Sequence, residues 1–135
     1  MKTLVLRLQP GDDLRPALEA AVRAAGVEAA FVLSGIGSLD RATLRLAGAE
    51  QVLTLAQDLE ILTLAGSIAA NGSHLHMSLA DRHGHVLGGH VGAGCHVRTT
   101  AEILLALLPD WELRREPDAR TGYAELDAQR RPGAI

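Results

Sequence analysis

In the segment from residue 74 to residue 80, the polar side chains of His74, His76 and Ser78 alternate with the apolar side chains of leucine and methionine. This period of two predicts a β-strand with two different faces, one of which carries His74 and His76. Residues 81–85 follow with the sequence Asp-Arg-His-Gly-His, which is typical of a tight turn. A three-residue loop with Gly84 in the left-handed conformation would close an antiparallel hairpin here. The hairpin restricts the fold because it sets two strands side by side in a defined register.

The length of the hairpin loop decides which side chains meet. A three-residue loop sets His76 directly opposite His90, whereas a two-residue loop would turn His90 to the other face. Directly opposed residues have Cβ atoms roughly 5 Å apart, and His74 lies one pleat along the same face. Three imidazole nitrogens could therefore meet at one Zn²⁺ ion. Glycines at positions 88 and 89 remove side chains beside this point, which would leave room for a water or ligand in a fourth position.

The spacing alone also permits ordinary surface histidines, because His-x-His is a common and unspecific pattern. The other three histidines have simpler interpretations. His83 is expected in the solvated loop and His85 at the end of the hairpin, while His96 could either orient a ligand or make ordinary hydrogen bonds. Cys95 is most simply a small buried residue, although a thiolate is also a soft metal ligand.

Two helices are expected from apolar spacing and capping patterns. Residues 14–25 place apolar side chains at helical spacing, and Gly26 suits a helix C-terminus. The pattern Thr99-x-x-Glu102 matches a capping box immediately before the apolar run 103–108. Pro109 would end that second helix.

The remaining elements are predicted to be short strands, which together indicate an α+β fold. They are expected over residues 3–9, 29–33, 42–47, 53–55, 59–70, 111–115 and 123–126, with a glycine-rich turn over residues 34–38. The pattern predicts a compact single domain with a mostly antiparallel β-sheet and two helices. We expect the domain to span residues 1–128 and residues 129–135 to form a loose C-terminal tail. Two helices of low polarity would leave apolar surface, which favours an oligomer.

Composition argues against several classes of function. A formal net charge of −3 does not suit a general binder of polyanions, and 2% aromatic residues are too few for a base-stacking platform. The single cysteine suits a reducing compartment, and the N-terminal apolar run is short for a signal peptide. We therefore expect a cytoplasmic protein without a membrane segment.

The order of motifs along the chain resembles the plants-and-prokaryotes-conserved (PPC) domain family. The resemblance spans about Leu4 to Leu126 and rests on five segments: Ser34-Gly35-Ile36-Gly37-Ser38-Leu39, residues 72–81 with His74 and His76, Gly84-x-Val86-x-Gly88-Gly89-His90, Thr100-Ala101-Glu102-Ile103, and Arg115-x-x-Asp118-x-x-Thr121-Gly122-Tyr123-x-x-Leu126. It implies a compact α+β domain assembled as a homotrimer. It also implies a bound metal, with zinc favoured, at His74, His76 and His90.

Three functions follow from the residues and the resemblance together. The first is a homotrimeric zinc-binding domain whose metal is structural or binds a small ligand. The second is a metal-dependent hydrolase or lyase, for which Glu102, Asp81 and Ser78 are candidate polar partners without an assigned catalytic role.

The third function is DNA binding, by kinship with plant proteins in which an AT-hook precedes this domain. An AT-hook needs Arg-Gly-Arg-Pro, and the nearest match is Arg-Arg-Pro-Gly at residues 130–133, which lacks the glycine between the arginines. Residues 35–38 could form an anion-binding nest, although a plain turn or a subunit boundary is the simpler expectation.

Overall fold

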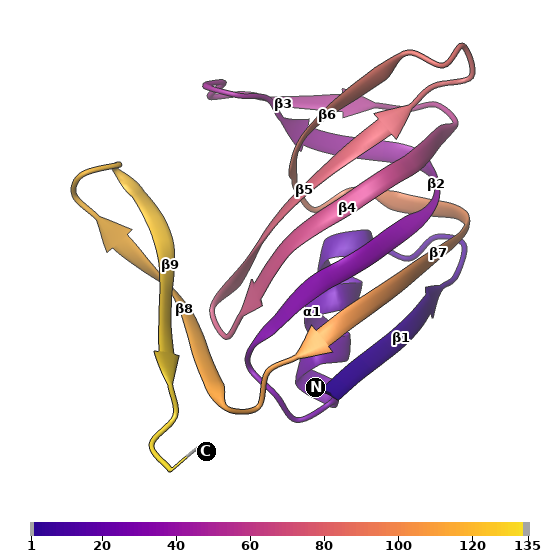
Figure 1. Cartoon of the computed structure of the whole chain (residues 1–135). Helices are drawn as coiled ribbons and strands as arrows, with labels where there is room; N and C mark the ends of the chain where they lie inside the picture. Colours follow the sequence, from indigo (N-terminus) through magenta and orange to yellow (C-terminus); the bar gives the residue numbers. More distant parts are fainter. Residues whose placement is uncertain (1, 134–135) are drawn as a thin grey trace.

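The computed structural model describes residues 2–133 and shows one helix packed against a strongly twisted antiparallel sheet (Figure 1). In chain order the elements are β1 (Lys2–Leu8), α1 (Leu14–Ala24), β2 (Ala30–Arg45), β3 (Val52–Leu55), β4 (Leu59–Ala69), β5 (Gly72–Ala80), β6 (Val86–Val91), β7 (His96–Leu107), β8 (Trp111–Asp118) and β9 (Tyr123–Arg130). Mostly antiparallel strands with a helix on one face confirm the α+β class.

The main sheet follows the strand order β1-β7-β2-β4-β5-β6, with β3 paired to β2. The long strand β2 also pairs with β6 near its end, where Leu44 lies opposite Val91 and Arg45 opposite His90. The path through β2, β4, β5 and β6 therefore closes on itself. Strands β8 and β9 form a separate hairpin that projects beside the sheet (Figure 1).

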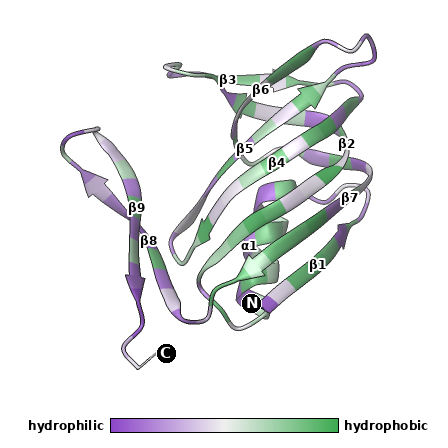
Figure 2. Ribbon diagram, in the orientation of Figure 1, coloured by the Kyte–Doolittle hydropathy of each residue, from purple (hydrophilic) through white to green (hydrophobic). Residues whose placement is uncertain are grey.

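Helix α1 covers one face of the sheet with a single apolar stripe. Leu14, Leu18 and Val22 are buried in the common core with the inward-facing residues of the strands. Figure 2 shows this pattern as alternating apolar and polar bands along the strands. The chain leaves the helix through Gly26, which has a φ of 73°, as the sequence pattern predicts.

The predicted second helix is wrong, because residues 96–107 form strand β7 between β1 and β2. The Thr99 hydroxyl lies 2.6 Å from the Ser38 hydroxyl instead of capping a helix. Leu105, Ala106 and Leu107 are all buried, and the end of β7 from Ile103 to Leu107 is apolar at every position. Such a run has no period that separates a strand from a buried helix. Within residues 2–133, α1 is the only helix.

Two further boundaries differ from the sequence prediction. The expected turn at residues 34–38 is instead a bulged part of β2, with register shifts after Val32 and Gly37. Gly37 lies so near β7 that an added Cβ would come within 2.5 Å of the Thr100 carbonyl oxygen. Strand β9 reaches Arg130, so residues 129 and 130 are paired with β8 and do not belong to a loose tail.

The face of the sheet opposite α1 carries exposed apolar side chains. Phe31, Leu33 and Ile36 of β2 are 38%, 49% and 53% exposed, and Val5 of β1 and Leu62 of β4 are also exposed. We call these five residues the outer apolar face. Over the part of the chain that the structure describes, no helix is long and apolar enough to span a membrane.

Candidate metal centre

The β5–β6 hairpin has the predicted register. His76 lies opposite His90, and Leu79 lies opposite Leu87. The loop is closed by two backbone hydrogen bonds, from Asp81 N–H to the His85 carbonyl and from Gly84 N–H to the Asp81 carbonyl, both at 3.0 Å. Gly84 has a φ of 80°, the left-handed conformation that this loop requires. The turn therefore places all three histidines on one face, as predicted.

The three histidine rings converge on one point outside the core. His74 Nε2 is 3.0 Å from His76 Nε2 and 3.2 Å from His90 Nδ1, and His76 Nε2 is 3.1 Å from His90 Nδ1. Nitrogens bound to one tetrahedral zinc ion at 2.0–2.1 Å lie about 3.3 Å apart, close to these separations. Among residues 2–133 these three side chains form the only group of three or more His, Cys, Asp or Glu residues that could hold a metal ion. The donor set therefore fits a metal ion.

The electrostatic surroundings favour the neutral form of two imidazoles of this cluster, those of His74 and His90. Burial lowers the pKa of His74, and the charges of His76, Arg115 and Arg45 lower it further, against the opposing effect of Glu125. Burial and the charge of Arg45 likewise lower the pKa of His90. The neutral ring is the form that binds a metal, so these shifts favour ligation near neutral pH.

Gly88 and Gly89 serve the packing of strands. A Cβ on Gly88 would lie 2.4 Å from the Met77 carbonyl oxygen, and one on Gly89 would lie 2.7 Å from the Arg45 carbonyl oxygen. Real Cβ atoms do not approach so closely, so both positions need glycine for β6 to fit between β5 and β2. The space predicted beside the histidines is thus occupied in part by neighbouring backbone.

A cavity of about 760 Å³ lies beside the histidine cluster, between the sheet and the β8–β9 hairpin. We call it the histidine cavity. Its lining includes Arg15 of α1, His74 and His90, together with Arg45, Arg115, Tyr123 and Glu125. None of the last four residues was expected at the site from the sequence. The sequence pattern indicated only the β5–β6 hairpin. The approach of β2 and β8 to the histidines depends on contacts between segments that lie far apart in the sequence.

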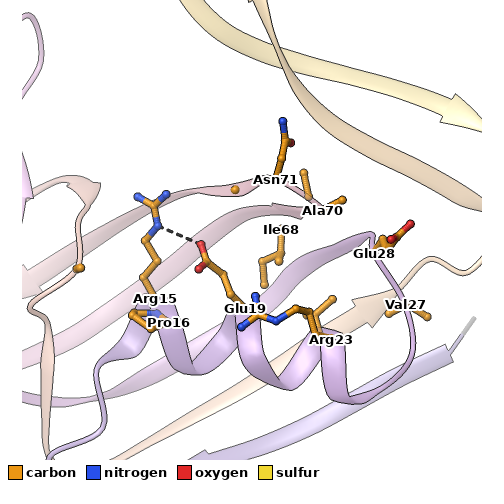
Figure 3. Close-up of a pocket in the computed structure, with 13 residues that line it drawn as sticks. Arg15, Pro16, Glu19, Arg23, Val27, Glu28, Ile68, Ala70 and Asn71 are labelled. Atoms are coloured by element: carbon orange, nitrogen blue, oxygen red, sulfur yellow. Dashed lines mark hydrogen bonds and ion pairs between the residues drawn. The ribbon is translucent and has the colours of Figure 1, made fainter.

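A second cavity of about 650 Å³ lies between α1 and the β4–β5 turn. Figure 3 shows Arg15 and Glu19 of α1 pointing into it below Asn71. Arg15 Nε and Glu19 Oε1 form an ion pair at 3.2 Å. Because these charges neutralise each other, this cavity is a weaker candidate for a charged ligand.

The other polar residues weighed in the sequence lie outside the histidine cluster. The Asp81 carboxylate accepts hydrogen bonds from the backbone N–H groups of His83 and His85 and pairs with the His85 ring, so it closes the loop. The Ser78 hydroxyl lies 2.7 Å from that of Thr63. Glu102 lies in β7, opposite Arg7 and Ile36.

His96 and Cys95 lie at the start of β7, away from the three converging rings. His96 is paired with Arg41 of β2 and forms a bridge with Asp13. Cys95 is buried, and its Sγ accepts a hydrogen bond from Thr43 N–H at 3.3 Å. Burial raises the pKa of the Cys95 thiol. These contacts agree with the simpler structural interpretation of both residues.

Residues 1–109 match the family model of the Plants and Prokaryotes Conserved (PCC) domain. The chain belongs to this family. The match ends just before β8, so the β8–β9 hairpin that closes the histidine cavity lies beyond it. A bifunctional protein GlmU from a Synechococcus strain is 48% identical over 129 residues, which cover 96% of this chain but only 20% of that protein.

Three solved structures share the PCC-domain fold. A hypothetical protein from Salmonella is 38% identical with a TM-score of 0.92, covering 96% of this chain and 94% of that one. A metal-containing protein from Archaeoglobus fulgidus is 28% identical with a TM-score of 0.80, covering 93% and 92%. A candidate DNA-binding protein from Ralstonia eutropha is 26% identical with a TM-score of 0.77, covering 91% and 89%.

Proposed function

We propose that this PCC domain binds a metal ion through His74, His76 and His90, and that the metal is Zn²⁺. The observation that carries the proposal is the convergence of three ring nitrogens within 3.0–3.2 Å of one another. The metal-containing relative from Archaeoglobus fulgidus supports it. Three imidazole ligands suit zinc, which favours nitrogen donors and tetrahedral geometry.

The site is of the open type, with three protein ligands and room for a fourth. Such a zinc ion acts as a Lewis acid and lowers the pKa of a bound water. The histidine cavity gives a small molecule access to this position, because His74 and His90 form part of its wall. The chain therefore supplies ligands, a neutral imidazole environment and a partly enclosed space beside them.

The proposal is tested by elemental analysis of the purified protein after incubation with zinc and removal of free metal. We expect one zinc per chain in the wild type and a large loss of bound zinc in His76→Ala and His90→Ala. His83→Ala is the matched control, because His83 lies in the exposed loop of the same hairpin. A wild type without stoichiometric metal, or equal zinc content in all variants, would overturn the proposal.

We further propose that the domain assembles as a homotrimer through the outer apolar face. Phe31, Leu33 and Ile36 expose apolar surface along β2, with Leu62 on the adjacent strand β4 and Val5 on β1, which β7 separates from β2. Contiguous apolar surface on a small domain favours association with another copy. The resemblance of the sequence motifs to those of the PPC domain family supports an assembly of three copies.

A metal-dependent hydrolase or lyase is the second candidate function. The observation that favours it is Glu125, a carboxylate in the same cavity as His74 and His90. A carboxylate near an open metal position could accept a proton from a bound water or substrate. Screening zinc-loaded protein against ester and hydroxy-acid substrates, with Glu125→Gln as the comparison, tests this function.

DNA binding is the third candidate, supported by the name of the Ralstonia eutropha relative. The formal net charge of −3 opposes it, because contact with phosphates needs a basic surface. A mobility-shift assay on duplex DNA at low salt decides the matter. Saturable binding that weakens steeply with added salt would support this function, and absence of binding would exclude it.

A further inference from the structure

Arg45 lies on the same face of the sheet as the histidine cluster. It is directly opposite His90 across the β2–β6 pair, and His90 is directly opposite His76 across the β6–β5 pair. Directly opposed residues share a face, so these three form one row across the strands. The Arg45 side chain is half-buried, and its Cζ lies 6.0 Å from the centre of the Tyr123 ring.

Arg115 reaches the same face from the β8–β9 hairpin. Its guanidinium donates a hydrogen bond to the Ser67 hydroxyl, and Ser67 is directly opposite His74 in the β4–β5 pair. The Nε atom of Arg115 is buried and has no hydrogen-bond partner among residues 2–133. A buried donor without an acceptor is costly, so a shift of the side chain that brought this N–H to a bound anion would be favourable.

The charges of Arg45 and Arg115 are not neutralised by ion pairs. The half-buried arginines of the described chain are Arg15, Arg45 and Arg115. Arg15 pairs with Glu19, but within residues 2–133 neither of the other two has a carboxylate oxygen within 4.0 Å. Two unpaired cations that line one cavity attract an anion strongly, because partial burial weakens screening by water.

We propose that Arg45 and Arg115 form a binding subsite for the carboxylate group of a small organic acid in the histidine cavity. The guanidinium group matches a carboxylate with parallel N–H donors. Arg15 and Glu125 also line this cavity; because Glu19 pairs with Arg15, the remaining charges of Arg45, Arg115 and Glu125 sum to +1. This balance favours a singly charged carboxylate over a doubly charged phosphate.

The subsite lies beside the histidines, so an acid held there by its carboxylate could direct a second oxygen to the metal. This deepens the proposed function and rests on it only for the metal contact. The arginine pair itself binds the carboxylate whether or not the metal is present, which makes the two proposals separable by experiment.

The test is a titration of the zinc-loaded wild type with sodium acetate at constant ionic strength. The readout is the arginine Nε–H resonances in ¹H–¹⁵N spectra. We expect saturable binding with a Kd on the order of millimolar, given the small size of the probe. The Arg115 Nε–H signal should shift most, because its donor gains an acceptor.

Arg45→Met and Arg115→Met should each weaken acetate binding on the order of tenfold, since each removes a charge-assisted hydrogen-bonding group. Arg98→Met is the matched control, because Arg98 lies on β7 outside the cavity and pairs with Asp58. Arg45→Lys provides a second variant that retains the charge and side-chain length, and it should weaken binding less than Arg45→Met.

The results also separate this subsite from the metal site. Acetate binding that persists in metal-free His76→Ala supports the subsite regardless of the zinc measurement. A wild type that binds zinc but shows no saturable acetate binding overturns the subsite and leaves the metal proposal intact. Tighter binding of inorganic phosphate than of acetate, or unchanged affinity in both methionine variants, also overturns it.

Discussion

His76 lies directly opposite His90 in the β5–β6 pair, with Nε2 and Nδ1 3.1 Å apart. This pairing depends on a loop several residues away, because the loop length sets which residues of the two strands face each other. The chemistry of the site is therefore controlled by the conformation of Gly84, whose φ of 80° permits the three-residue turn.

Replacing Gly84 by alanine should destabilise the protein and weaken metal binding. A left-handed conformation costs a residue with a Cβ roughly 1–2 kcal/mol. We expect a lower urea midpoint for Gly84→Ala and reduced zinc affinity in competition with a chelating dye. Arg82→Ala is the control in the same loop, and an equal effect of both variants would contradict the role given to the turn.

Asp13 should be important for stability although it makes no side-chain cap to α1. Its carboxylate accepts hydrogen bonds from the N–H groups of Gly94 at 2.8 Å and Cys95 at 3.3 Å, which link the helix start to the β6–β7 connection. Asp13→Ala leaves these donors unsatisfied and should cost about 1–3 kcal/mol. Equilibrium unfolding in urea measures the loss.

Asp13→Asn retains one acceptor oxygen and should lose less stability than Asp13→Ala. Asp12→Ala is not a neutral control, because the Asp12 carboxylate accepts a hydrogen bond from Gln9 N–H. Asp40→Ala, at an exposed position of β2, is the better comparison. Unfolding midpoints that do not differ between Asp13→Ala and Asp40→Ala would refute the proposed link.

Cys95 should react slowly with thiol reagents in the folded protein. Burial raises the pKa of its thiol. The reactive thiolate is therefore scarce at pH 8 and remains the minor form up to the pH that equals the ordinary thiol pKa. We expect slow labelling by iodoacetamide throughout this pH range and rapid labelling in urea. Native labelling at pH 8 as fast as that of a free cysteine would show that the thiol is accessible and unperturbed.

A charge on the outer apolar face should disrupt the proposed trimer. Ile36→Glu places a carboxylate where the side chain is 53% exposed in a single copy. If this face is covered in an assembly, the buried charge would be strongly unfavourable. Light scattering should give a trimer mass for the wild type and a smaller mass for the variant.

Val86→Glu is the matched control for the trimer, because Val86 is also exposed and lies at the hairpin end of β6. It should keep the wild-type mass. A wild type with the mass of a monomer would refute the trimer. Loss of assembly in both variants would show that the effect of an added charge is not specific to the outer apolar face.

The convergence of the three histidines could be predicted from sequence because the geometry that produces it is local. Alternation fixes the face of His74 and His76, and one loop fixes His90, so no knowledge of other strands is needed. The positions of the two arginines beside the histidines could not be predicted in this way. Arg45 reaches the β5–β6 hairpin only because the end of β2 pairs with β6. Arg115 lies in β8 and reaches the same face through its hydrogen bond to Ser67, which lies 48 residues earlier in the chain.

The fold class was predictable from the many short alternating segments, but the identity of β7 was not. Its apolar end carries no period, and Thr99 and Glu102 happen to match a helix cap. In the folded chain this segment pairs with β1 and β2 along both edges, and those ladders outweigh its local preference for a helix.

Strand β6 pairs with β5 along one edge and with the end of β2 along the other. This double pairing limits where another polypeptide chain can add a strand to the sheet. An unpaired strand edge offers a template on which another polypeptide can add a strand. At His90 both edges of β6 are already hydrogen-bonded within the domain. The strand that carries this histidine is thereby protected at that end from intermolecular sheet extension, whereas residues 86–89 of β6 pair along one edge only.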